Sequence, residues 1–388
     1  MKRSLSDSSI QPQQSALFRP HQFLDLFSRA STQTLSRAAV AVAVAWIPVA
    51  MLSALRSGAS FASFLTDYAA QSRFLVIILV LILAEPPLRE RLAQVAHHFE
   101  AFLVPRDQLR KFQAEWISCG KLRDSWLARI LIAVLAYATV IWLEQYLSPG
   151  GAEFLSWWKG GGGLRFLSPA GTWAAFVPYP ILLYFTFLWL WRHLLWARFL
   201  RSTTLLNLRL IAAHPDHLGG LGFIEASLRG QLPFSFCMGV GMAGAVANRV
   251  IHEGHSLFAF RYLALILIGA VLLICILPYC VFTGTLMQMR RRGMYRYGAF
   301  AHAVGEQFEK KWLHRADSLD EDVLTVPDFS TTTDLYGVVG NIDDIRVIPV
   351  NLVDVYALLI AALVPGIPVV IAAIPFDTVI RDAVKLLF

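Results

Sequence analysis

Long uncharged apolar segments constrain the fold of this chain more than any other feature of its sequence. The segment Tyr262–Met289 contains no charged residue, and 172–191 is uncharged as well. A helix needs about 20 apolar residues to cross the hydrocarbon core of a bilayer, because it rises about 1.5 Å per residue. Segments of this kind recur along the chain, which predicts an all-α, polytopic integral membrane protein with about seven transmembrane helices. Residues 38–376 would form one multi-pass membrane domain, with spans near residues 38–55, 68–84, 126–147, 172–191, 232–251, 262–287 and 355–376.

The composition supports a chain that is solvated by lipid. Hydrophobic residues make up 56% of it and charged residues 16%, whereas soluble domains carry about 25% charged residues. The net charge of +7 raises the question of nucleic-acid binding, but Lys and Arg lie beside the apolar runs without a nucleic-acid-reading motif. The four cysteines form no CxxC pair, so neither a zinc ribbon nor a disulfide framework is indicated. The expected partner is the lipid bilayer, and no nucleic acid is expected.

The distribution of Lys and Arg predicts the orientation in the membrane. Basic residues concentrate in 85–125, 192–231 and 290–354 and are sparse in the intervening connections. Cytoplasmic loops carry an excess of Lys and Arg, so we expect these three loops and the polar tail 1–37 to be cytoplasmic. An odd number of spans then places the amphipathic C-terminal tail, 377–388, on the external side of the membrane.

The three predicted cytoplasmic loops have the pattern of helices. In 85–125, apolar residues repeat at helical spacing until Pro105 ends a first helix, and a second helix follows. Beyond Met289 the sixth span is expected to continue as a helix, whereas the acidic stretch 316–334 is expected to be irregular. These segments predict a cytoplasmic helical layer, in which 290–350 could bind a cytoplasmic protein partner.

The stretch HPDHLGGLGF, residues 214–223, carries the most conspicuous polar chemistry. As a turn, it would use Asp216 to accept backbone N–H bonds, while proline and the glycines supply the required dihedral angles. As a metal site, it would combine His214, Asp216 and His217 with a further ligand such as His193, because imidazole and carboxylate groups bind zinc or iron. The turn is the favoured interpretation, no metal site is assigned, and no cofactor is predicted.

The fifth span contains a series of small residues. Its GVGMAG stretch matches the dinucleotide-binding pattern GxGxxG, but it lies inside an apolar segment without the strand and the acidic residue that this site requires. Small residues four apart instead let two membrane helices approach closely. The sequence therefore predicts a helix-packing face, through which the chain could also form a homo-oligomer. The face comprises Gly239, Gly241, Gly244 and Ala245.

Few polar groups are expected inside the membrane. No carboxylate lies near the middle of a span, which argues against ion-coupled transport through a buried acid. Trp157 and Trp158, in a predicted external loop, are expected to anchor the chain at the level of the lipid headgroups. Prolines within the spans permit kinks, which could shape a pore or serve helix packing alone. These prolines are Pro178, Pro180, Pro278, Pro365 and Pro368.

Five patches stand out when the chain is taken as a whole. They are AEPPLRERL with HHF (84–99), HPDHLGGLGF, YGAFAHAV followed by KKW (297–312), DLYGVVGNIDDIRVIPV (334–350) and the proline-rich last span. In this order they resemble a group of uncharacterised bacterial multi-pass membrane proteins, with HPDxxGGLGF the most specific element. The resemblance covers most of the chain from the second span onward. It implies a bacterial inner-membrane location and carries no activity, substrate or catalytic residue.

Three functions are open from the sequence. The first is a channel or transport protein without a buried coupling carboxylate, regulated by its cytoplasmic layer, which the proline-broken spans favour. The second is a membrane-embedded, metal-dependent enzyme that uses His214, Asp216 and His217. The third is a sensor or scaffold that recruits a cytoplasmic partner through the acidic loop. The first is the leading hypothesis, and a non-enzymatic role is favoured over an enzymatic one.

Overall fold

The structure, a computed structural model, describes residues 31–146, 156–160, 167–313 and 328–373. These residues are predominantly helical and contain no strand beyond one isolated bridge, between Lys159 and Leu167. Within them, seven helical segments are long and apolar enough to cross a membrane. The segments are Thr32–Arg56, Tyr68–Leu103, Trp126–Leu143, Pro169–Thr204, Gly222–Ile251, Leu257–Trp312 and Leu352–Ala373. The predicted fold class, an all-α polytopic membrane protein, is confirmed.

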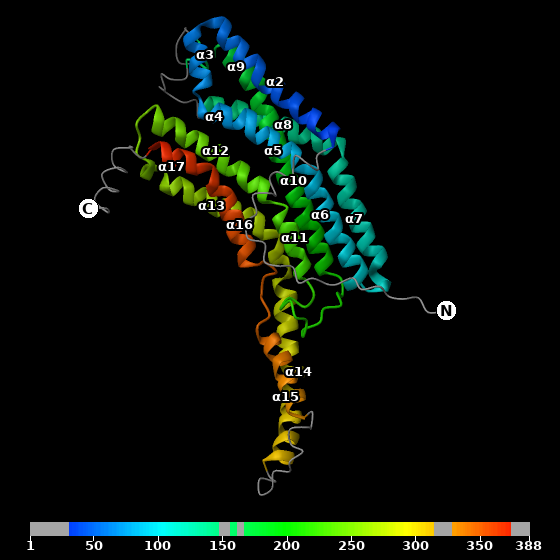
Figure 1. The fold of residues 1–388 in the computed structure, drawn as a ribbon. Coiled ribbons are helices and arrows are strands. Elements are labelled where there is room, and N and C mark those ends of the chain that lie inside the picture. The colour runs from blue at the N-terminus through cyan, green and yellow to red at the C-terminus, as the bar shows by residue number, and fades with distance from the viewer. Residues whose placement is uncertain (1–30, 147–155, 161–166, 314–327, 374–388) are drawn as a thin grey trace, which may run out of the picture.

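Short interruptions divide these segments into the helices labelled in Figure 1. The first half of the chain contains α2 (Thr32–Arg56), α3 (Gly58–Leu65), α4 (Tyr68–Gln71), the π-helical η1 (Ser72–Ile77), α5 (Ile78–Leu83), α6 (Glu85–His98), η2 (Phe99–Leu103), η3 (Arg106–Gln108), α7 (Leu109–Asp124) and α8 (Trp126–Tyr146). The second half contains α9 (Pro169–Phe176), α10 (Pro178–Thr204), η4 (Gly222–Ile224), α11 (Glu225–Arg229), α12 (Leu232–Ile251), η5 (Leu257–Phe260), α13 (Arg261–Ile276), η6 (Leu277–Phe282), α14 (Thr283–Trp312), α15 (Asp328–Asp343), α16 (Leu352–Leu363), η8 (Val364–Gly366) and α17 (Ile367–Ala373).

The first helix begins before the apolar run that predicts it. Ser31 caps α2, because its hydroxyl accepts a hydrogen bond from the Thr34 amide, and the helix starts at Thr32. The rest of the predicted N-terminal tail, 1–30, and the predicted C-terminal tail, 377–388, lie outside the described residues.

The helical hairpin expected in 85–125 is present as α6 and α7. Pro105 follows the extended residue Val104 and separates the two helices, as its fixed φ and missing N–H donor require. α7 lies along α10, where Phe112 and Trp116 both pack edge-on against Phe199, with ring centroids 5.4 and 5.0 Å apart. Aromatic contacts therefore hold this hairpin against the helical body.

Prolines mark the interruptions in three spans. Pro178 begins α10 after one non-helical residue that separates it from α9. Pro278 lies in η6, between α13 and α14, and Pro365 lies in η8, between α16 and α17. Proline lacks an N–H donor and clashes with the preceding turn, so interruptions at these positions follow from the sequence. Pro180 and Pro368 lie in the first turn of α10 and α17, where proline is tolerated.

The small residues of the fifth span pack against helices of the same chain. A Cβ on Gly239 would clash with the Ala362 carbonyl of α16, and one on Gly244 would clash with the Ser72 hydroxyl of η1. A Cβ on Gly241 would also approach η1 closely. Gly239 and Gly244 are therefore covered by the chain's own helices, and the formation of a homo-oligomer stays a prediction.

A buried carboxylate joins three segments at one end of the helical body. Asp67 is 4% exposed and accepts hydrogen bonds from the Trp157 indole at 3.0 Å, the Asn248 side-chain amide at 2.8 Å and the Ala70 amide at 2.9 Å. Trp157 and Trp158 are 1% and 7% exposed. Their predicted role as headgroup anchors is wrong, because Trp157 satisfies a buried acid inside the protein.

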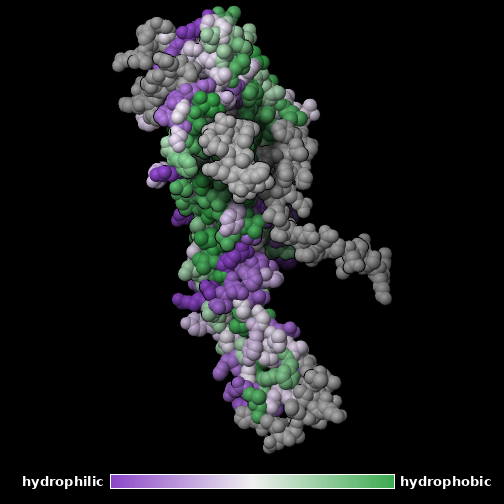
Figure 2. Space-filling model, turned by 60° about the vertical axis from the view of Figure 1, so that its left-hand side comes forward, coloured by the Kyte–Doolittle hydropathy of each residue, from purple (hydrophilic) through white to green (hydrophobic). Residues whose placement is uncertain are grey.

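Two helices project from the opposite end of the body (Figure 1). The C-terminal part of α14, from Gly293, and α15 form this hairpin, which we call the stalk. Figure 2 shows a hydrophobic body and a band of hydrophilic residues where the stalk begins. The continuation of the sixth span beyond Met289 is therefore confirmed, and α14 reaches Trp312.

The stalk corrects one expectation. The acidic stretch 316–334 was expected to be irregular, but its described part, 328–334, is the start of α15. Phe329 packs against Phe308 and Trp312 of α14, with ring centroids 4.9 and 5.2 Å apart. Packing against α14 therefore outweighs the weak helix propensity of a stretch rich in Thr and Asp. Residues 316–327 lie outside the described ranges.

Candidate functional site

The HPDHLGGLGF stretch forms a rigid turn around one carboxylate. Asp216 accepts hydrogen bonds from the backbone amides of Leu218 at 2.9 Å, Gly220 at 3.1 Å and Gly222 at 2.9 Å. Gly219 and Gly220 have φ values of 67° and 95°, which side-chain-bearing residues rarely adopt. The loop therefore has the geometry of the turn interpretation, in which the aspartate supplies acceptors and the glycines supply left-handed backbone.

The environment of Asp216 favours its charged form. Burial raises the pKa of this carboxyl. The backbone hydrogen bonds from Gly222, Leu218 and Gly220, together with the side-chain hydrogen bond from His214, lower the pKa by more than burial raises it. The net effect is a pKa below the usual value for aspartate. The carboxylate is thus committed to holding the turn as an anion.

The three candidate histidines lie in different environments. The Nδ1 of His214 is 2.8 Å from an Asp216 oxygen, and the Nδ1 of His217 is 3.3 Å from the Asn341 carbonyl in α15. His193 is buried in α10, and its ring packs against Phe234 at a centroid distance of 5.4 Å. Among the described residues, no three His, Cys, Asp or Glu side chains form a group that could hold a metal ion. His193 thus supplies no third ligand to the loop.

Arg346 ties this loop to the base of the stalk. Its backbone amide donates to the His217 carbonyl at 2.9 Å, and its guanidinium donates to the Asp216 carbonyl at 3.3 Å. The same guanidinium contacts the Glu225 carboxylate of α11 at 3.0 Å. Together with the His217–Asn341 contact, these bonds join the end of α15, the turn and α11, and we call this region the stalk junction.

A second polar group of residues lies beneath the stalk junction, inside the body. We call it the buried polar cluster, and it consists of Trp196 (α10), Ser227 (α11), Tyr279 (η6) and Asp354 (α16). The hydroxyls of Ser227 and Tyr279 are 2.8 Å apart, and both residues are fully buried. The Trp196 indole and the Asp354 carboxylate lie close to the same Tyr279 hydroxyl.

Asp354 is the charged member of this cluster. It is 3% exposed, and one of its oxygens accepts a hydrogen bond from the Arg229 guanidinium at 2.7 Å. Its other oxygen is buried without a hydrogen-bond partner. The flanking residues His193 and Gln231 each carry one more buried polar atom without a partner.

Buried polar atoms without hydrogen-bond partners favour the binding of a polar molecule. Buried polar groups are nearly always hydrogen-bonded to protein or to water, because leaving one unsatisfied costs about 1–3 kcal/mol. Here buried polar atoms without partners occur together with the Arg229–Asp354 ion pair. This arrangement suits the binding of water or of a small polar or ionic solute.

The sequence indicated this site only in part. It identified Pro278, whose break places Tyr279 in η6 rather than in a regular helix. It argued against transport through a buried acid because no carboxylate lies near the middle of a span, and it gave no sign that Asp354 is buried. It also attached no role to Arg346 or Arg229. Their partners lie more than a hundred residues away in the chain, beyond the reach of local patterns.

Comparisons with known proteins add no assignment to this geometry. No protein-family model, curated protein or solved structure matches the chain.

Proposed function

We propose that this chain is a transport- or channel-type membrane protein whose polar pathway begins at the buried polar cluster. The observation that carries the proposal is the gathering of Ser227, Tyr279 and Asp354 where a proline interrupts the sixth span. Ionisable groups inside a membrane domain are costly, so they commonly mark the path of a solute. Interrupted helices also expose backbone carbonyls, which can line such a path.

The orientation fits an entrance from the cytoplasm. The segments 85–125, 192–231 and 290–354 carry the excess of Lys and Arg, and their helices and loops reach the stalk end of the body (Figure 1). The positive-inside rule then makes the stalk end cytoplasmic, with the N-terminus on the same side and the C-terminus in the periplasm of a bacterial inner membrane. The buried polar cluster would face the cytoplasmic entrance.

The stalk would regulate this entrance through the stalk junction. Arg346 contacts both the HPDHLGGLGF turn and Glu225, and Glu225 begins the short helix that carries Ser227 and Arg229. A displacement of α15 would therefore reach the buried polar cluster through one short helix. Such coupling requires two arrangements of this contact network that differ in their affinity for a ligand or partner.

Flux measurements on reconstituted protein test the proposal. Proteoliposomes would be challenged with gradients of protons, of alkali cations and of small neutral solutes, with protein-free liposomes as the reference. We expect permeation above the reference for at least one class, and a loss of about tenfold or more in Tyr279→Phe and Asp354→Asn, because a lost polar contact of about 1.4 kcal/mol changes a rate tenfold. The matched control Thr186→Val removes a hydroxyl that only contacts its own helix at the Leu182 carbonyl.

Two outcomes would contradict the proposal. One is flux no greater than in protein-free liposomes under every gradient. The other is flux that is unchanged in both cluster variants while the protein remains folded. Normal flux in Thr186→Val is required for the comparison to hold.

The shape of the stalk favours a second function, the recruitment of a partner protein. Tyr295, Phe300 and Tyr336 of the stalk are 75%, 59% and 50% exposed. Exposed aromatic residues often take part in protein-binding surfaces. Capture of a defined protein by the wild-type chain, lost in Phe300→Glu and retained in the cluster variant Tyr279→Phe, would support a sensor or scaffold; equal capture by all three proteins would count against it.

A further inference from the structure

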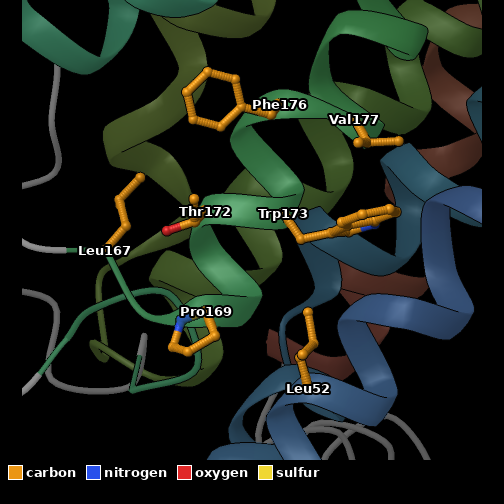
Figure 3. Close-up of a pocket in the computed structure, with 7 residues that line it drawn as sticks. All are labelled: Leu52, Leu167, Pro169, Thr172, Trp173, Phe176 and Val177. Atoms are coloured by element: carbon orange, nitrogen blue, oxygen red, sulfur yellow. The ribbon is translucent and has the colours of Figure 1, made fainter.

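An apolar groove lies between α2 and α9, at the end of the body opposite the stalk. Figure 3 shows the lining side chains, with Leu52 on α2 and the others on α9 or next to it. The groove has a volume of about 510 Å³, within the range of roughly 300–1,000 Å³ that small-molecule sites occupy. Its lining residues are Leu52, Leu167, Pro169, Thr172, Trp173, Phe176 and Val177. All but Thr172 are apolar, so the interior suits a hydrocarbon chain.

The groove runs in the direction in which a lipid acyl chain extends into a bilayer. Pro169 begins α9 and Phe176 ends it, so the groove follows this helix for about 10 Å at a rise of 1.5 Å per residue. On α2, Leu52 lies one turn before Arg56, the last residue of the helix. The groove therefore runs from the end of a membrane span toward the interior of the hydrocarbon layer.

Two basic residues, Arg56 and Lys159, lie next to residues that line the groove. The Arg56 guanidinium donates hydrogen bonds to the Lys159 carbonyl at 2.5 Å and the Ser156 carbonyl at 2.8 Å. Lys159 in turn pairs with Leu167, a lining residue, in the isolated bridge. Neither cation forms an ion pair with a described residue. The Arg56 guanidinium is thus fixed near the groove by backbone carbonyls, and neither positive charge is neutralised by an acidic side chain among the described residues.

We propose that this groove binds an anionic phospholipid. One acyl chain lies between α2 and α9, and the phosphate lies against Arg56 and Lys159. The two cations favour a headgroup with a net negative charge over a zwitterionic one, because the latter adds a positive charge at the same place. The apolar groove makes the acyl chain necessary, so the headgroup alone binds weakly.

Competition between defined lipids tests the proposal. The full chain in detergent would be titrated with phosphatidylglycerol and with phosphatidylcholine of identical chains, and the bound lipid would be counted by native mass spectrometry. Glycerol 3-phosphate serves as the arm that carries the phosphate without acyl chains. We expect one tightly bound phosphatidylglycerol and no binding of glycerol 3-phosphate in the same concentration range. The ratio of the affinities for phosphatidylglycerol and phosphatidylcholine should fall about fivefold for each cation removed.

Variants separate the contributions of charge and groove. Arg56→Gln with Lys159→Gln is expected to remove the preference for phosphatidylglycerol, whereas Thr172→Trp, which fills the groove from an exposed position, is expected to weaken both lipids. The matched control Arg261→Gln removes an exposed cation that stacks on the neighbouring Tyr262 and should bind like the wild type.

Three outcomes would overturn the proposal. They are an equal affinity of the wild-type chain for both lipids, a preference that persists in the Arg56/Lys159 double variant, and binding of glycerol 3-phosphate as tight as that of the lipid. Each variant is compared at a thermal unfolding midpoint equal to that of the wild type, and Arg56→Gln alone replaces the double variant if the latter does not fold.

Discussion

Replacing Asp216 with alanine should open the HPDHLGGLGF turn without unfolding the helical body. The carboxylate accepts three backbone hydrogen bonds, from Leu218, Gly220 and Gly222, and its side chain is only 20% exposed. A hydrogen bond to a charged group contributes about 1.5–3 kcal/mol. Because the loop lies at the surface, water can replace part of each bond in the variant. We therefore expect a loss of about 1 kcal/mol per bond, or about 3 kcal/mol in total, in the free energy of local opening.

Hydrogen exchange measures this free energy directly. A loss of about 3 kcal/mol corresponds to roughly a hundredfold faster exchange of the three amides, since 1.4 kcal/mol is a factor of ten. The measurement would compare peptides that cover 214–224 in the wild type, in Asp216→Ala and in Asp216→Asn. The asparagine variant keeps one neutral acceptor, so we expect an intermediate rate.

A matched control is available in the same region. Asp344 is an exposed carboxylate that follows α15, so Asp344→Ala changes the net charge at the stalk end equally. We expect its 214–224 peptides to exchange like those of the wild type. An increase of less than threefold in Asp216→Ala would refute the assignment of this aspartate as the acceptor that holds the turn.

Three further predictions concern titration and packing. The pKa of Asp216 is lowered in the folded protein, so the contribution of its carboxylate to the stability of the turn is fully present above the unfolded pKa of about 3.9 and is lost as pH falls through the lower folded pKa. Hydrogen exchange of the loop amides, corrected for intrinsic rates, should therefore stay constant from neutral pH down to about 5 and rise only below about 4. Gly239→Ala should destabilise the protein by about 1–3 kcal/mol, because its Cβ clashes with the Ala362 carbonyl, whereas Gly269→Ala, which meets no atom within 4 Å, should be neutral or stabilising by up to about 1 kcal/mol in chemical unfolding. Trp157→Phe should cost about 1–3 kcal/mol, because a buried carboxylate loses its indole donor, and thermal unfolding unchanged from the wild type would contradict this role.

Local sequence patterns predicted those parts of the candidate site that depend on residues close together in the sequence. The Asp216 turn needs an acceptor, a proline and glycines within ten residues, all of which the sequence displays. The break before Tyr279 follows from Pro278 in the same way. In contrast, Arg346 gave no signal, because its partner Glu225 is 121 positions away.

The same distinction explains the two corrections in the body and the stalk. Trp157 occurs in a predicted loop, and only the approach of Asp67, 90 residues earlier, shows that it is buried. The start of α15 has a weak helical pattern, and only the aromatic contacts of Phe329 with α14 account for its helix. Intrinsic propensity is a small energy, and tertiary packing readily exceeds it.

By itself, the sequence determined that this protein is an all-α, polytopic membrane protein, where its spans fall, where prolines interrupt them and where a tight turn lies. Lipid imposes these features because every backbone polar group in the hydrocarbon must be satisfied within a helix, and apolar length is visible along the chain. The tertiary structure alone decided that Asp67 and Asp354 are buried, since Asn248 and Arg229 lie 181 and 125 positions away from them. The burial of a charge depends on the partner that reaches it in space, and that partner is fixed only when the helices pack.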